Sequence, residues 1–450
     1  KELSPEHVAK QQQLTTVPTN EASIEGLPDA LLLIIIKYVK KQCSISQFIS
    51  TVAAFNQRFR RLAMSGHLWK SRDFSSKDTV CWIIKNVDLA LVRFNKALRL
   101  KKLEHFSPME IITIFDALGK HVRTLVLHTS DSMFKSHQSL CQDLMIRRCT
   151  SLVELEIGQV MMSAFIPCLA SLPKLVNLTV YDICSIPATE GIIQLFDALD
   201  SNCTGLTSLM LGSETSVLFL EHPLNKISQL KNLCIFDCFA LQENFFTHLP
   251  PSLTSLKIFS EDQAMASTVW IAGNSSLESL DIKIAPEGLV TVKIEDCSQF
   301  RSFRMEGNRI DDFCSTFQSC PNLREVDLAY FEQCENSVHR IIDCPSITSL
   351  HSPKALSVDL YGTLPSLTDL NIVYLDDSIS WSVTDLLRQL AAPTTLQDLT
   401  IVGHEFTEQL LEISLPQLQL FTIRAPCRLP HTISMDCPML KGLFLTTGSE

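Results

Sequence analysis

Six of the sixteen cysteines occupy one fixed place in a repeated sequence pattern, three residues before an apolar Leu-x-x-Leu-x-Leu frame. These six are Cys149, Cys203, Cys297, Cys320, Cys344 and Cys437. Thiols that converge can bind zinc or form disulfides. Equivalent positions of a repeat, however, lie about one repeat apart and point into the core. We therefore expect these cysteines to be small buried side chains that donate weak hydrogen bonds.

Other residue patterns do not predict a catalytic site. The sequence contains no Gly-x-Gly-x-x-Gly, Gly-x-x-x-x-Gly-Lys-Ser/Thr, His-Glu-x-x-His or Gly-x-Ser-x-Gly motif, and its twelve histidines are isolated. The acidic pairs at 311–312 and 376–377 fall in predicted turns, where solvation or helix capping accounts for them. We therefore expect a binding protein that is not an enzyme and needs neither a metal nor another cofactor.

Short strands are the elements that must position the cysteines. The first, fourth and sixth residues of each frame are apolar, so a strand turns them into a shared core while the residues between face solvent. Fourteen frames begin at residues 122, 152, 175, 206, 230, 253, 277, 300, 323, 347, 367, 396, 418 and 440. The frame at 347 is degenerate and keeps only Ile347 and Leu350.

The frames between 253 and 347 recur every 23 or 24 residues, a period typical of leucine-rich repeats. One repeat cannot bury its own apolar face, whereas a stack can. We predict an α/β fold in which about 14 repeats form a curved solenoid over residues 122–450, with parallel strands on the concave face. On the convex side we expect helices over 133–148, 191–199, 310–317 and 383–390, a short turn over 225–229 and an extra strand at Leu289, Val292 and Ile294.

Composition narrows the function classes. Apolar residues make up 46% of the chain and charged residues 19%, which suits a long core and is too apolar for a disordered chain. The net charge of −11, without a basic stripe, argues against a general nucleic-acid binder. The longest apolar run, 30–36, is too short to cross a membrane. Dispersed cysteines in a large chain predict reduced thiols, and hence the cytoplasm or nucleus.

The first 72 residues have a different character. Residues 1–23 are polar and predict a flexible tail. A helix then opens near Pro28, with Leu27, Leu31, Ile35 and Tyr38 on one face, and further helices are expected over 45–54 and 56–64. A bundle this small rarely holds a large core, so an exposed apolar face on it favours binding to a partner. Residues 73–121 form a junction with degenerate first repeats and a helix over 108–118.

Residues 24–72 resemble an F-box. The resemblance is carried by Leu27-Pro28-Asp29-Ala30-Leu31-Leu32, then Ile35, Tyr38-Val39, the run Phe55 to Ala63, and Leu68-Trp69. It implies docking on a Skp-type adaptor, and through it a cullin scaffold, by Leu27, Pro28, Leu31, Leu32 and Ile35, with Trp69 closing the bundle. Ala30, Ile34 and Phe59 depart from the family pattern. The alternative is an ordinary helical cap on the solenoid.

An F-box followed directly by leucine-rich repeats is a familiar family arrangement, and the Cys-Pro-x-Leu form at 320, 344 and 437 resembles the repeats of that family. The resemblance implies a substrate receptor of a ubiquitin ligase. Two other readings share the repeats: an interaction scaffold without a ligase role, and a GTPase-activating leucine-rich-repeat protein. The latter needs a positioned Arg or Asn that the sequence does not reveal.

The concave face is the predicted substrate-binding surface, because frame positions three, five and seven point outward. Position seven places Tyr181, Phe236 and Phe259 there, with Met210 from position five. Lys257, Lys283 and Arg304 follow, mixed with Asp281, Glu306 and Asp327. Aromatic and Met side chains are frequent binding anchors. We expect this patch to hold a protein substrate or peptide, unless a loop or the C-terminal tail covers it.

Overall fold

The protein is described here by a computed structural model that divides into two compact units, Lys1–Ala97 and Leu98–Glu450. The structure describes residues 27–42, 52, 57–63, 97–101, 107–128, 147–184, 188–212, 218–219, 224–236, 240–241, 243–260, 268–284, 289–307, 312–331, 336–353, 357–361, 364–373, 395–402, 410–425 and 432–446. Each unit is treated by itself.

The first unit contains two described helices, α2 (Asp29–Gln42) and α4 (Gln57–Ala63). Leu32, Ile36, Phe59 and Leu62 are buried and form its core. The Arg58 guanidinium ties the helices together, because it donates to Asp29 Oδ1 and to the Leu27 carbonyl, both at 2.7 Å. Helix α4 confirms the helix predicted over 56–64. The one predicted over 45–54 lies outside the described residues except Val52, and Trp69 lies outside them as well.

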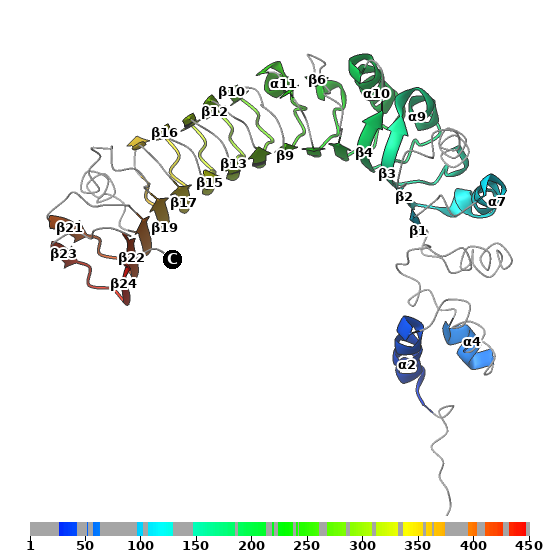
Figure 1. The fold of residues 1–450 in the computed structure, drawn as a ribbon, viewed down its shortest axis with the longest axis horizontal. Coiled ribbons are helices and arrows are strands. Elements are labelled where there is room, and N and C mark those ends of the chain that lie inside the picture. The colour runs from blue at the N-terminus through cyan, green and yellow to red at the C-terminus, as the bar shows by residue number, and fades with distance from the viewer. Residues whose placement is uncertain are drawn as a thin grey trace, which may run out of the picture. The chain divides into compact units, whose positions relative to one another are not determined.

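The second unit is a parallel-strand solenoid of the leucine-rich-repeat type, and its main sheet has 15 strands in strict chain order (Figure 1). All fourteen frames form strands of this sheet, and β1 precedes them within the predicted junction, so the sheet begins before residue 122. Its strands are β1 (Ala97–Lys101), β2 (Thr124–His128), β3 (Glu154–Met161), β4 (Asn177–Cys184), β5 (Ser208–Gly212), β7 (Asn232–Phe236), β9 (Ser255–Ser260), β11 (Ser279–Ile284), β13 (Ser302–Gly307), β15 (Glu325–Phe331), β17 (Ser349–Pro353), β19 (Asp369–Val373), β20 (Asp398–Val402), β22 (Leu420–Arg424) and β24 (Gly442–Thr446).

Strand register keeps equivalent frame positions side by side. Ile258, Ile282, Met305 and Leu328 are sixth-position residues of successive frames, and each pairs with the next and is fully buried. A one-residue slip would expose the whole row. The apolar spacing therefore fixes both the pairing and the face that each side chain occupies. Within this unit, the main sheet lines the inner side of the curve (Figure 1).

A second parallel sheet covers the middle repeats on the outer side, with strands β10 (Thr268–Ala272), β12 (Leu289–Glu295), β14 (Asp312–Gln318), β16 (Asn336–Ile342) and β18 (Ser357–Tyr361). Two smaller sheets pair β6 (Leu218–Phe219) with β8 (Ala240–Leu241), and β21 (Leu410–Ser414) with β23 (Thr432–Asp436). The extra strand predicted at 289–294 is confirmed as β12. The Phe303 and Phe317 rings, with centroids 5.0 Å apart, join the main and outer sheets across the core.

The helix predicted over 310–317 is wrong, because the described part of this segment, 312–317, belongs to strand β14. Phe313, Ser315 and Phe317 are buried in alternation, while Cys314 and Thr316 between them are partly exposed. This period of two fits a strand. The strand is held on both sides by parallel pairing with β12 and β16.

Helices lie over the earlier repeats on the outer side, as Figure 1 shows. They are α7 (Pro108–Leu118), η4 (Gly119–His121), α9 (Met162–Leu169), α10 (Ala188–Asn202), η6 (Leu224–Lys226) and α11 (Glu243–Thr247). The predictions over 108–118, 191–199 and 225–229 are confirmed by α7, α10 and η6. Helix α7 begins with a capping box in which Ser107 and Glu110 bond each other's backbone N–H groups. The predictions over 133–148 and 383–390 lie outside the described residues, apart from the helical residues 147–148.

A membrane-crossing helix is not found: none of the helices in the described ranges combines the length and the apolar character that a bilayer requires.

Candidate functional site

The repeated cysteines stand at corners where the chain turns into the next inner frame, from a strand at Cys297, Cys320, Cys344 and Cys437 and from helical residues at Cys149 and Cys203. The residue before each corner adopts a left-handed conformation in four successive repeats, at Gly273 (φ 65°), Asp296 (54°), Ser319 (53°) and Asp343 (53°). Three of these residues donate a backbone hydrogen bond to the following repeat: Gly273 to Glu295, Asp296 to Gln318, and Ser319 to Ile342. The corners are thus linked in a ladder along the solenoid.

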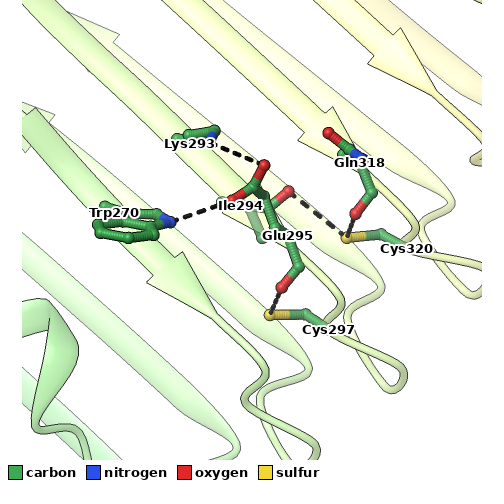
Figure 2. A network of polar contacts seen from close by, with 7 residues as sticks. All are labelled: Trp270, Lys293, Ile294, Glu295, Cys297, Gln318 and Cys320. Atoms are coloured by element: carbon green, nitrogen blue, oxygen red, sulfur yellow. Dashed lines mark hydrogen bonds and ion pairs between the residues drawn. The ribbon is translucent and has the colours of Figure 1, made fainter.

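The thiols at these corners bond to backbone carbonyls, as expected from the sequence. Cys203, Cys320 and Cys344 donate to carbonyls of the preceding repeat at 3.7–3.8 Å. Figure 2 shows Cys320 bonding Ile294 and Gln318, and Cys297 bonding the Glu295 carbonyl at 3.3 Å. Cys437 is partly exposed, whereas the other five are buried. Burial raises the pKa of Cys149 to about 12, and the pKa of Cys203 and Cys297 to about 11. These thiols serve packing.

A half-exposed tryptophan, Trp270, lies on the outer sheet beside this ladder, and the sequence interpretation missed it. The Trp270 indole is 46% exposed, and its Nε1–H donates to Glu295 Oε2 at 3.2 Å (Figure 2). Lys293 Nζ lies 2.8 Å from the other Glu295 oxygen and 5.6 Å from the Trp270 ring centroid. The alternation in β10, with Val269 and Ile271 buried, was the signal that Trp270 faces outward.

The predicted aromatic residues of the inner sheet fall into two groups. Phe236 and Phe259 stand on neighbouring strands and stack, with centroids 5.0 Å apart and planes at 14°. Tyr181 is 43% exposed and donates from its hydroxyl to Glu156 Oε1 at 3.2 Å on strand β3. Burial and the charge of Glu156 raise the Tyr181 pKa. Strand β5 lies between β4, which carries Tyr181, and β7, which carries Phe236.

Gly212 and Met210 belong to that intervening strand. Gly212 pairs with Phe236, and a Cβ at position 212 would lie 2.4 Å from the Tyr181 carbonyl oxygen. Glycine is therefore required by the close approach of the β4 backbone. Met210 is partly exposed and pairs with Cys234, which in turn pairs with Lys257. The predicted Met and the aromatic pair thus share one region of the sheet.

Two of the predicted basic residues, Lys283 and Arg304, form ion pairs on the inner sheet. Lys283 Nζ lies 3.2 Å from Glu306 Oε1, and Arg304 Nε lies 3.5 Å from Asp327 Oδ2. Asp327 Oδ1 also contacts His351 Nδ1 at 3.0 Å. Fifth-position residues therefore alternate in sign across neighbouring strands, in the order Lys257, Asp281, Arg304 and Asp327, and His351 takes the same position on the next strand. Both charges of each pair are partly exposed, so the pairs add little stability.

Acidic residues farther along the inner sheet were missed by the sequence interpretation. Asp369 and Asp398 are paired directly on β19 and β20, and Glu325 occupies the same frame position on β15. Burial and the neighbouring Asp398 charge raise the Asp369 pKa, while His351 acts in the opposite direction. The signal was available, because all three are third residues of their frames.

The predicted partner-binding helix presents an apolar face. Leu31, Ile34 and Tyr38 on α2 are 47%, 64% and 67% exposed. Pro28 is exposed, and Leu27 and Ile35 are partly exposed. Leu32 is fully buried, so its predicted place on a binding surface is corrected: it packs in the helical core, while Ile34 takes an exposed position.

Comparisons with known proteins add little to this geometry. No protein-family model matches the chain, and no curated protein matches it. Among solved structures, the crystal structure of a TLR13–ssRNA13 complex is similar over 73% of this chain and 60% of that chain, with 14% identity and a TM-score of 0.30. This chain therefore covers less than two thirds of that chain's length. The assignment of a leucine-rich-repeat solenoid rests on the strand register and frame positions described above.

Proposed function

We propose that the protein is the substrate-recognition subunit of a Skp/cullin/F-box ubiquitin ligase and is not itself an enzyme. In this proposal the first unit is an F-box that docks a Skp-type adaptor, and the repeats hold the protein substrate. The observation that carries it is the exposed apolar face of α2, formed by Leu31, Ile34 and Tyr38.

The spacing of the exposed apolar residues on α2 favours coverage of this helix face by a partner protein. Leu31, Ile34, Ile35 and Tyr38 follow the spacing of one helical face, while Leu32 and Ile36 on another face are buried in the bundle. Fully burying a Leu or Ile side chain contributes roughly 1.5–3 kcal/mol. Because Leu31 and Ile34 are 47% and 64% exposed, covering both with an adaptor would contribute roughly 2–3 kcal/mol, which supports docking by this helix.

The inner sheet supports the second half of the proposal. Its stacked phenylalanines, with Met210 beside them and charged pairs farther along, offer apolar anchors within a polar surface. Tyr181, Lys257, Lys283 and Arg304 complete the predicted contact set. In this proposal the receptor binds the substrate with these residues, while other subunits of the ligase transfer ubiquitin. The buried reduced thiols suit the cytoplasm or the nucleus, which we propose as its location.

The decisive experiment is an adaptor pull-down with purified full chain. We expect wild type to retain the adaptor and Leu31→Glu/Ile34→Glu to lose it, because two charges would be placed in the apolar contact. Lys37→Glu is the matched control, since it alters the charge of an exposed residue of the same helix without removing apolar surface. Failure of the wild-type chain to bind adaptor would contradict the ligase role.

Substrate capture is tested separately. Phe236→Ser/Phe259→Ser is expected to abolish it while adaptor binding is unchanged, because the two sites lie in different units. The second candidate function, an interaction scaffold with no ligase role, uses the same inner sheet but needs no adaptor. Retained partner binding by a wild-type chain that does not bind the adaptor would favour the scaffold.

A further inference from the structure

The inner sheet contains two regions of different chemistry. The aromatic pair, Phe236 and Phe259, lies on β7 and β9 next to Lys257. The acidic region lies on β15, β19 and β20 and consists of Glu325, Asp369 and Asp398. Between them, Lys283 pairs with Glu306 and Arg304 with Asp327, so the intervening strands are close to neutral. The surface is therefore polarised along the solenoid.

The acidic region lacks compensation within the described residues. Asp369 and Asp398 are direct neighbours on paired strands, and neither makes an ion pair within the described part of the chain. Like charges opposite each other destabilise a sheet. His351 lies near this pair, but its Nδ1 is already bonded to Asp327. A cation from a bound protein would remove this repulsion, whereas an acidic segment would increase it.

A path of small side chains connects the two regions. Third-position residues Ser255, Ser279, Ser302 and Ser349 stand on β9, β11, β13 and β17, and Ser255 and Ser279 bond each other at 3.0 Å. Small residues let a polypeptide backbone lie close to the sheet. Glu325 on β15 is the acidic member of the same row and leads towards Asp369.

The sheet also sets the distance between the regions. Strands β9 and β19 are five steps apart in the sheet order, and β7 and β19 are six. At about 4.8 Å per step this gives roughly 24–29 Å. An extended chain advances about 3.3 Å per residue, so the same distance spans about seven to nine residues.

We propose that the inner sheet binds an extended segment of a protein that carries an aromatic or large apolar side chain and, about seven to nine residues away, lysine or arginine. The apolar side chain packs on Phe236 and Phe259, and the basic side chains face Asp369 and Asp398. This inference rests on the proposed function, because it takes the inner sheet as the substrate-binding surface, and it names the chemical class of that substrate.

The test uses fluorescein-labelled 14-residue synthetic peptides in a Gly/Ser background, with one Phe and a Lys-Lys pair eight residues apart, in both chain directions. Binding to the full chain is measured by fluorescence anisotropy. We expect one direction to bind, and binding to weaken at least tenfold when the spacing is cut to four residues or when Lys-Lys becomes Glu-Glu.

The matched variants separate local charge from net charge. Asp369→Asn/Asp398→Asn is expected to weaken binding of the eight-residue peptide at least tenfold. Glu412→Gln/Asp436→Asn removes the same two charges from exposed positions on β21 and β23 and should change binding less than twofold. Equal loss in both variants, indifference to spacing, or no binding of either peptide by the wild-type chain would overturn the inference.

The same preparations distinguish this inference from the proposed function. Adaptor retention without peptide binding would reject the substrate class and leave the ligase role standing. Peptide binding with correct spacing in a chain that does not retain the adaptor would support the inference and reject the ligase role.

Discussion

The Ser315 hydroxyl lies 2.9 Å from His339 Nδ1 in the core between the two sheets, where both side chains are almost fully buried. They are paired on neighbouring outer strands, and the Phe313 ring centroid is 5.5 Å from the imidazole. Among the residues that the structure describes, His339 Nε2 finds no hydrogen-bond partner, and neither does the buried hydroxyl of Ser352 on β17. Ser352 occupies the sixth position of the degenerate frame at 347, so a hydroxyl stands there in the core where the other frames place an apolar side chain.

Acid should destabilise the solenoid through His339. Burial lowers its pKa from 6.5 to about 3, so the imidazole is neutral in the folded chain. Between pH 6.5 and 3 the unfolded chain binds the extra proton, and stability is therefore lost as the pH falls through this window. The loss is at most about 1.4 kcal/mol per pH unit for one proton.

Replacing the pair tests this assignment. Ser315→Val/His339→Val extends the row of valines formed by Val269 and Val292, and should flatten the dependence of urea unfolding on pH between 6.5 and 4.5. An exposed histidine variant, His121→Gln, serves as the control and should leave that dependence in place. Equal pH dependence in wild type and the double variant would show that His339 binds its proton equally in the folded and unfolded chain, which contradicts a pKa lowered by burial.

The fold of the second unit was largely predictable from two regularities of the inner frames. Buried and exposed residues alternate within each strand, and the frames between 253 and 347 recur every 23 or 24 residues. The outer sheet was not predictable in this way. Ile310, Phe313 and Phe317 are spaced like one face of a helix, and the alternation that marks β14 depends on Ser315 being buried. Its burial depends on His339, 24 residues away, so no local pattern could reveal it.

The corner residues should respond oppositely to substitution. Gly273 has φ 65°, so Gly273→Val is expected to destabilise by about 1–2 kcal/mol, although no atom lies within 4 Å of the added Cβ. Ser319 adopts the same conformation at the equivalent corner, and Ser319→Gly should be neutral or stabilising. Thermal unfolding of both variants checks this. Equal effects in the same direction would contradict a conformational cause.

Adding even a methyl group at Gly212 should destabilise the protein. The added Cβ would lie 2.4 Å from the Tyr181 carbonyl oxygen, and a backbone atom in a sheet cannot move away cheaply. We expect Gly212→Ala to cost about 1–3 kcal/mol. Gly205→Ala is the control, because the Cβ added at position 205 would lie 3.8 Å from its nearest neighbour, the Leu175 carbonyl oxygen. Urea unfolding should show little change in the control and a clear loss at 212.

Three of the corner cysteines, Cys149, Cys203 and Cys297, should be unreactive in the folded chain. Their raised pKa values keep Cys149, Cys203 and Cys297 as thiols at neutral pH, and the thiolate is the reactive form. Iodoacetamide at pH 7.5 is expected to leave these three unlabelled until urea is added. Mass spectrometry of the labelled peptides provides the measurement, and rapid labelling without urea would contradict their burial.

The candidate surface was partly predictable for a related reason. Alternation assigned Phe236, Phe259, Lys283 and Arg304 to the correct face, since a strand turns every second side chain outward. It could not show that Phe236 stacks on Phe259 while Tyr181 turns to Glu156, because these contacts depend on ring orientation. The acidic pair Asp369 and Asp398 stands in frames that are 29 residues apart in sequence, and only the register brings them together.

The backbone ladder at the corners has an evolutionary consequence. Since Gly273, Asp296 and Ser319 each bond the following coil in the same way, a duplicated or deleted coil presents its neighbours with the surfaces they already fit. Such an event between β9 and β19 would lengthen or shorten the interval between two anchoring regions by one strand. Selectivity can therefore change in whole-coil increments, with every contact residue left unaltered.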